Sequence, residues 1–134
     1  DATYQNASLS EMFRVCSIGG NIYLSGKNNN YYKNDNKALQ AEINARKKQH
    51  PNYFTDVKKM IKLAQQTGCI SLKKSFFFEK RGDSTLNKYT NKEVTTYYEY
   101  FLIFEKTDHK NINLDNFSDS FSETFKSLGN DELG

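Results

Sequence analysis

The sequence lacks long apolar runs and contains little arginine. Its longest wholly apolar stretch is Tyr100 to Phe104, whereas a membrane-spanning helix needs about 20 apolar residues. We therefore expect no spanning helix in this chain. Arginine occurs three times against sixteen lysines, and the net charge is only +3. Because bidentate recognition of bases and phosphates depends on arginine, we expect no nucleic-acid partner.

Residues that carry catalysis or bind metals are few and scattered. His50 and His109 have no cysteine or carboxylate neighbours at metal-binding spacing. Glu99 and Glu105 share one face of a predicted strand but lie roughly 20 Å apart along it, too far for a carboxylate pair. Phosphate-binding loops, dinucleotide fingerprints and paired CxxC motifs are missing. We therefore expect a non-enzymatic protein without catalytic residues, metal or cofactor.

Cysteine occurs twice, as Cys16 and Cys69, and the first residue is Asp1 rather than Met. We expect that an export or anchoring segment was removed before that first residue, the alternative being a chosen chain boundary. Exported proteins commonly keep disulfides. We expect a Cys16–Cys69 disulfide that clamps the N-terminal region onto the sheet and stabilises the fold by roughly 4 kcal/mol. The alternative is two buried thiols. The disulfide predicts a periplasmic or secreted protein.

The length of 134 residues predicts a single domain, residues 1–134. Leu9, Phe13 and Cys16 recur at helical spacing, with Ser8 or Ser10 as the candidate N-cap. Two further helices are predicted over 37–50 and 52–68, and Pro51 separates them. Because their connection is short, we expect an antiparallel helix pair.

From Cys69 onward the apolar period changes from 3.6 to 2. In the predicted strand 69–80 the even positions are apolar and should face the core, except Lys74; they are Ile70, Leu72, Phe76 and Phe78. The segment 93–106 predicts a long central strand, since both of its faces carry apolar residues. A hairpin alone is marginal in water, so residues 21–25 are expected to add a third strand.

The C-terminal segment 114–128 predicts an acidic amphipathic helix, because large apolar residues recur at helical spacing: Phe117, Phe121, Phe125 and Leu128. The predicted fold is therefore α+β, with N-terminal helices, an antiparallel sheet of three to four strands and this C-terminal helix. Arg81-Gly82-Asp83 resembles an adhesion tripeptide, but the same residues suit a polar turn. We interpret it as a turn.

Charge is distributed unevenly, with fifteen Lys or Arg against five Asp or Glu in residues 27–92. A lysine cluster on the two predicted helices is our candidate partner surface: Lys47, Lys48, Lys58, Lys59 and Lys62. We expect an exported protein-binding module, for example a periplasmic accessory or regulatory domain of a membrane-associated system, with an acidic or membrane-anchored protein partner. The alternatives are an immunity or inhibitor protein that neutralises a secreted toxin and a small-ligand sensor.

Overall fold

The computed structural model describes residues 2–27, 36–49, 53–78, 86–87, 99–109 and 125–127. They form three helices and six strands, which confirms the predicted α+β class. In chain order these are α1 (Ala2–Val15), β1 (Asn21–Lys27), α2 (Asn36–Lys47), β2 (Tyr53–Thr55), α3 (Val57–Gln66), β3 (Ile70–Phe78), β4 (Leu86–Asn87), β5 (Glu99–Lys106) and β6 (Phe125–Ser127). None of these three described helices has the length and hydropathy needed to cross a bilayer.

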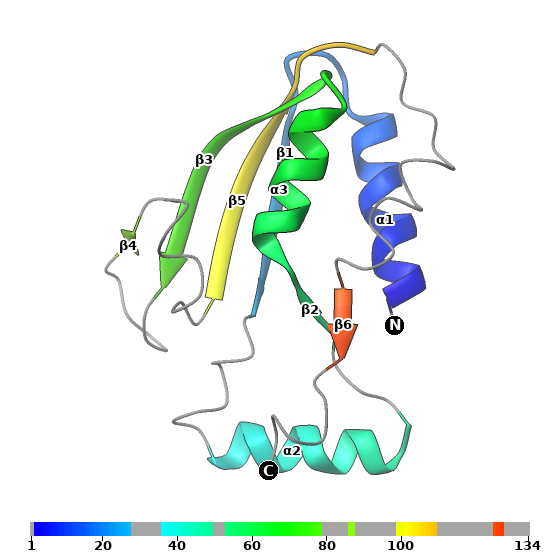
Figure 1. The fold of residues 1–134 in the computed structure, drawn as a ribbon, viewed down its shortest axis with the longest axis vertical. Coiled ribbons are helices and arrows are strands. Elements are labelled where there is room, and N and C mark those ends of the chain that lie inside the picture. The colour runs from blue at the N-terminus through cyan, green and yellow to red at the C-terminus, as the bar shows by residue number, and fades with distance from the viewer. Residues whose placement is uncertain are drawn as a thin grey trace.

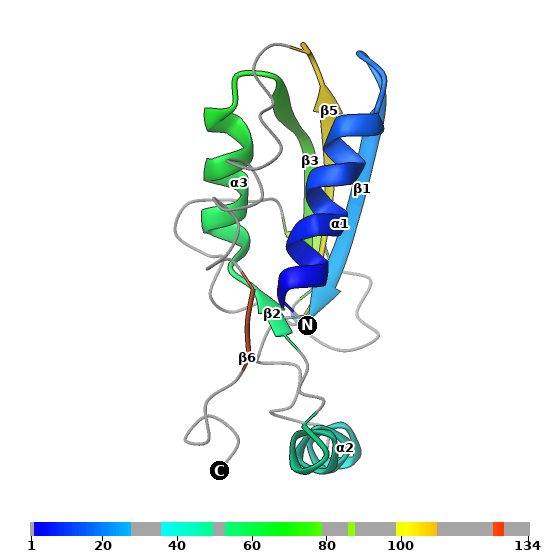
Figure 2. The same ribbon diagram turned by 90° about the vertical axis from the view of Figure 1, so that its right-hand side faces the viewer.

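The main sheet is antiparallel, with the strand order β1-β5-β3-β4. Its central strand is β5, and β1 supplies the predicted third strand. Helices α1 and α3 cover the same face of this sheet (Figures 1 and 2). The short strands β2 and β6 pair separately. Helix α2 lies at one end of the molecule, beyond this small ribbon (Figure 1).

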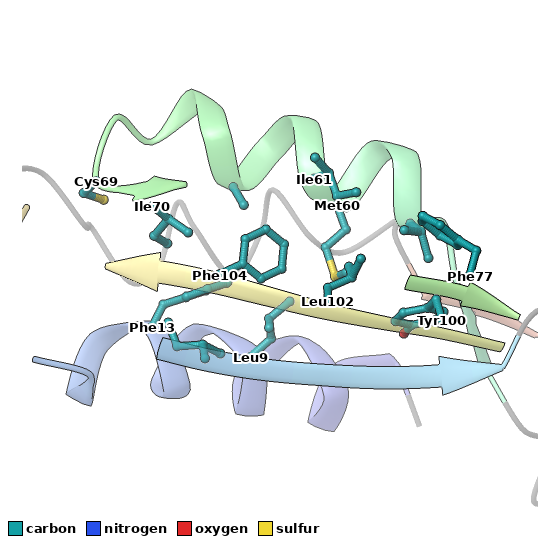
Figure 3. Packing of buried hydrophobic residues seen from close by; sticks show 13 residues of the cluster. Leu9, Phe13, Met60, Ile61, Cys69, Ile70, Phe77, Tyr100, Leu102 and Phe104 are labelled. Atoms are coloured by element: carbon teal, nitrogen blue, oxygen red, sulfur yellow. The ribbon is translucent and has the colours of Figure 1, made fainter. Parts of the chain in front are cut away.

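The core lies between β5 and the two covering helices. Along β5 the even residues Tyr100, Leu102 and Phe104 are buried, as their alternation predicts. The rings of Phe13 and Phe104 meet edge to face with centroids 5.7 Å apart, a favourable aromatic geometry. Met60 of α3 packs onto β5 from the other helix (Figure 3). The predicted central position of this strand is confirmed for its described part, since β5 lies between β1 and β3.

Lys106, the last residue of β5, joins the end of α1 to the sheet. Its side chain is 1% exposed, and its Nζ donates a hydrogen bond to Arg14 O at 2.9 Å. Its backbone accepts from Gly19 N at 2.7 Å and donates to Gly20 O at 3.0 Å. One buried lysine thus satisfies a carbonyl at the C-terminal end of α1 and aligns the start of β1 with β5.

The predicted core face of β3 is wrong beyond Leu72. A β-bulge lies between Leu72 and Lys74, and one extra residue moves every later side chain to the opposite face. Phe77 is therefore buried at 4% exposure, whereas Phe76 and Phe78 are half-buried on the other face. The bulge also explains why Lys74 interrupted the expected alternation.

The predicted antiparallel helix pair is wrong. The second helix begins only at Val57, after Asp56, whose Oδ1 accepts a hydrogen bond from Lys59 N at 3.0 Å and caps the helix. The preceding residues of that prediction form β2 instead. Helix α2 consequently lies apart from α3 and crosses its direction (Figures 1 and 2). Gly68 follows the C-cap Thr67 and has φ +72°, the left-handed conformation that glycine commonly adopts after a helix.

The predicted Cys16–Cys69 disulfide is wrong, because both cysteines are free. Cys69 is fully buried just before β3, and its Sγ donates to Thr67 Oγ1 at 3.1 Å. Cys16 Sγ lies against Gly20, just before β1: a Cβ on Gly20 would meet it at 2.8 Å. Strand β5 separates β1 from β3, so these positions are two strand spacings apart, about 10 Å. A disulfide needs Cα atoms within about 7 Å.

Most of the predicted C-terminal helix, 114–128, lies outside the described residues. The part that is described, Phe125–Ser127, is the strand β6 and pairs with β2, so the helix prediction is wrong there. Pairing with β2 supplies backbone partners that a local helical pattern does not anticipate. The Arg81-Gly82-Asp83 turn also lies outside the described residues.

We predict that Phe77→Ala lowers the free energy of unfolding by about 3–5 kcal/mol, because it leaves a cavity in the core. Phe76→Ala is the matched control, since it removes the same ring from the half-buried face, and it should cost clearly less. Urea denaturation of the two variants measures the difference. Equal losses, or a greater loss for Phe76→Ala, would contradict the bulge-shifted face.

Candidate functional site

A groove lies between α1 and the edge strand β1. Its volume is about 290 Å³, near the lower end of the range for ligand pockets. Five residues of α1 line one wall: Tyr4, Gln5, Ser8, Leu9 and Met12. The last four residues of β1, 24–27, line the opposite wall, and Tyr53, Thr55 and Tyr100 close the floor. We call this the α1–β1 groove.

The β1 wall of this groove includes a backbone edge that no described strand covers. Lys106 N–H donates to Gly20 O, and hydrogen-bonded residues alternate along an antiparallel ladder. With the continuous register of β1 and β5, the backbone groups of Tyr23 and Ser25 therefore point away from β5. An edge of this kind is a template on which another extended chain can pair.

Exposed large apolar side chains lie on α1, on β1 and in the turn between them, and two of them, Tyr4 and Met12, line the groove. Tyr4, Met12 and Val15 follow helical spacing on one side of α1, and they are 74%, 37% and 64% exposed. Tyr23 on β1 is 56% exposed. Among the side chains that the structure describes, the remaining member of this exposed set is Ile18, in the turn that joins α1 to β1. Clustered exposed apolar residues typically mark a binding surface.

Tyr100 forms the floor of the groove beneath Gly26. Its phenol donates a hydrogen bond to Thr55 Oγ1 at 2.7 Å. A Cβ on Gly26 would lie 2.5 Å from the phenol oxygen, so only glycine leaves space for this ring on the neighbouring strand. Burial raises the pKa of the Tyr100 phenol above its usual 10.0, and the hydrogen bond with Thr55 opposes part of that rise.

The face of α1 that meets the groove and the core contains polar atoms without partners. Gln5 Oε1 and Asn6 Oδ1 are buried and accept no hydrogen bond. Ser10, which was a candidate N-cap, lies inside the helix instead, and its Oγ donates to Asn6 O at 2.9 Å. A buried acceptor without a donor is unfavourable, and Gln5 lies in the wall of the groove.

An aromatic row continues from β1 across the sheet face that α1 and α3 leave uncovered. The ring centroid of Phe101 lies 6.1 Å from that of Tyr23 and 6.2 Å from that of Phe76. Charged side chains of both signs border this row, and Lys73 Nζ lies 3.8 Å from Glu105 Oε2. Such an exposed ion pair contributes little to stability. The aromatic row therefore adds an apolar surface beside the free edge of β1.

The predicted lysines do not lie together on one surface formed by two packed helices. Lys47 and Lys48 are exposed at the end of α2, whereas Lys58 and Lys62 are exposed on α3. Lys59, also on α3, is half-buried. The binding role of these lysines stays a prediction. Metal-ligand clusters of His, Cys, Asp and Glu do not occur within the described ranges.

Sequence reasoning missed the residues of the groove. Tyr4, Gln5 and Ser8 lie before or at the start of the predicted first helix, which in fact begins at Ala2. One local signal was available: Gly26 falls at the end of a strand pattern, and glycine in a strand often marks close approach of another group. The residues that approach it, Thr55 and Tyr100, are distant in sequence, so the groove itself was not predictable.

We predict that stability falls as the pH rises above about 10, because the unfolded chain then loses the Tyr100 proton that the folded protein retains. This contribution is fully present below the unfolded pKa and disappears as the pH rises through the higher folded pKa. Urea denaturation at increasing pH measures it. Tyr100→Phe should make the decline shallower, whereas Tyr23→Phe, which changes an exposed phenol, should not. Equal declines in both variants would contradict the prediction.

Comparisons with family models, with curated proteins and with solved structures find no match for this chain. Its function is therefore inferred from its own residues. The features that bear on function are the α1–β1 groove, the uncovered edge of β1 and the exposed apolar side chains around them.

Proposed function

We propose that this protein is a non-enzymatic protein-binding module that binds an extended segment of a partner protein along β1, in the α1–β1 groove. The segment adds a strand to the main sheet next to β1. Its backbone groups pair with those of Tyr23 and Ser25, which point away from β5. Main-chain pairing supplies affinity in this mode of recognition, and alternate side chains supply specificity.

The observation that carries this proposal is the coincidence of the free edge with the exposed apolar residues. An edge strand that needs protection usually carries charges, proline or a bulge. Between Ile22 and Gly26, β1 has none of these, and its exposed residues are the aromatic Tyr23 and the neutral Ser25. On the opposite wall, Tyr4 and Met12 offer apolar surface to the side chains of the added strand.

An extended polypeptide fits this site better than a partner helix. The outward backbone groups of β1 repeat every second residue, and only another extended chain repeats its own donors and acceptors at that spacing. The aromatic row of Tyr23, Phe101 and Phe76 continues the surface available to side chains on the uncovered face. We therefore propose a partner segment with alternating apolar residues.

The periplasmic or secreted location stays a prediction, and the free cysteines remove the disulfide from its support. An immunity or inhibitor protein would be one case of the same proposal, with a toxin segment as the added strand. A small ligand would instead occupy the groove alone.

Selection of peptides from a random phage-displayed library against the full chain tests the proposal. We expect selected peptides to bind in extended form and to slow hydrogen exchange of the Tyr23 and Ser25 amides, as measured by NMR. Ser25→Pro should abolish binding, because proline removes an outward N–H while leaving the ladder to β5 intact. Ser25→Ala keeps that N–H and is the matched control.

Three outcomes would contradict the proposal. The library could give no enriched peptide, or the selected peptides could bind Ser25→Pro as well as they bind Ser25→Ala. The chain could also form a dimer in sedimentation experiments that Ser25→Pro dissociates, in which case the added strand is a second copy of β1. Circular dichroism of both variants checks that the fold is retained.

A further inference from the structure

The aromatic row on the uncovered face of the main sheet ends at the edge strand β1. Along β1 the burial alternates: Ile22 is buried at 4% exposure, whereas Tyr23 is 56% exposed. Tyr23 therefore points to the face that α1 and α3 do not cover. Its neighbours on β5, Phe101 and Ile103, are half-buried on that face. The row thus becomes more exposed toward the free edge of the sheet.

Tyr23 packs on the row from the side of β5. Its ring centroid lies 6.1 Å from that of Phe101, with the two ring planes tilted by 34°, and Ile103 lies directly opposite it in the register of β1 and β5. On the other side of β1, no described strand lies beside Tyr23. More than half of the residue's surface consequently stays open to solvent.

An added strand would place one side chain directly beside Tyr23. This inference rests on the proposed function, since it concerns what the docked segment carries. The described strand pairs of the main sheet are antiparallel, and in that arrangement opposite residues point to the same face with Cβ atoms about 4.5–5.5 Å apart. The backbone groups of Tyr23 point away from β5, so the residue opposite it would exchange both hydrogen bonds with it.

The surroundings of Tyr23 favour an aromatic ring at this position. Residues 21–25 of β1 carry no charge, so an ionised side chain would find no opposite charge on the strand with which it pairs. A ring would bury apolar area of its own and of Tyr23, and aromatic pairs across strands are favourable. A cation could also lie over the Tyr23 ring, but its charged group must stay hydrated, so it would bury less apolar area.

We propose that the docked segment carries an aromatic side chain, from phenylalanine, tyrosine or tryptophan, at the position opposite Tyr23, and that this ring extends the aromatic row by one strand. Tyr23 is thus the specificity-determining residue on the uncovered face. Backbone pairing with Tyr23 and Ser25 fixes where the segment lies, and the ring contact selects which segment lies there.

Peptides selected from the phage-displayed library against the full chain test this inference. The probe is the most enriched peptide, made synthetically, and NMR contacts between the two strands identify the residue opposite Tyr23. We expect that residue to be aromatic. Its replacement by alanine should weaken binding about fivefold, as measured by calorimetry, and its replacement by arginine should weaken binding as well. The alanine peptide should still slow hydrogen exchange of the Tyr23 and Ser25 amides, because the backbone pairing remains.

Substitution of Tyr23 gives the second arm of the test. Tyr23→Thr removes the ring but keeps a residue that favours strands, and its backbone N–H stays available for pairing. On this variant the aromatic and alanine peptides should bind with nearly equal affinity. Tyr23→Phe keeps the ring, so it is the matched control and should keep the fivefold preference. If Tyr23→Thr does not fold, as checked by circular dichroism, the three peptides on the unaltered protein decide the point.

The inference is overturned if the residue opposite Tyr23 is not aromatic, if the alanine peptide binds as tightly as its parent, or if the arginine peptide binds more tightly. It is also overturned if Tyr23→Thr keeps the preference for the aromatic peptide. These results leave the proposed function intact as long as the peptides protect the Tyr23 and Ser25 amides. Peptides that bind without protecting those amides contradict the proposed function, and this inference with it.

Discussion

The attachment of α1 to the end of β5 through Lys106 is the constraint on which the arrangement of the groove depends. Lys106 Nζ bonds to Arg14 O near the C-terminal end of α1, and its backbone bonds to the turn that leads into β1. Helix and edge strand are therefore fixed together at one end of the sheet. The groove lies between residues 4–12 of α1 and residues 24–27 of β1.

Near the end of β1, Gly26 has no side chain, and the ring of Tyr100 from the neighbouring strand β5 packs against it. Tyr100 occupies the space that a Cβ on Gly26 would need, and its hydroxyl bonds to Thr55 on β2. This contact links the main sheet to the β2–β6 ribbon. The Tyr100 ring, in place of a side chain on β1, therefore lines the groove at this point.

Periodicity in the sequence predicted the elements whose burial is determined locally. Apolar residues on both faces of 93–106 identified the central strand, and the helix predicted over 52–68 ends close to the observed end of α3. Two features depended on pairing with distant segments. Residues 53–55 continue a helical pattern, but their partner strand is 125–127. The cysteines seemed well placed for a bridge, but their spacing carries no information about the strand that lies between them.

The candidate site was less predictable than the fold, because it depends on contacts between segments that are distant in sequence. Gln5 and Gly26 belong to different elements, and nothing in either segment indicates that they line one groove with Thr55 and Tyr100. Tyr4, Met12 and Val15 are exposed on α1, although their spacing would equally suit residues that face the core. The side of α1 that is buried in the structure is the opposite one, which carries Phe13. Tertiary packing decides which stripe faces the core.

The bulge in β3 has a consequence for how this strand tolerates changes in length. Two residues there lie opposite one residue of β5. The residues before the bulge and those after it therefore alternate between the two sheet faces in separate phases. Removing Lys73 would restore simple alternation without turning Phe77 away from the core. A chain that lacks Lys73 at this bulge could therefore fold into the same sheet.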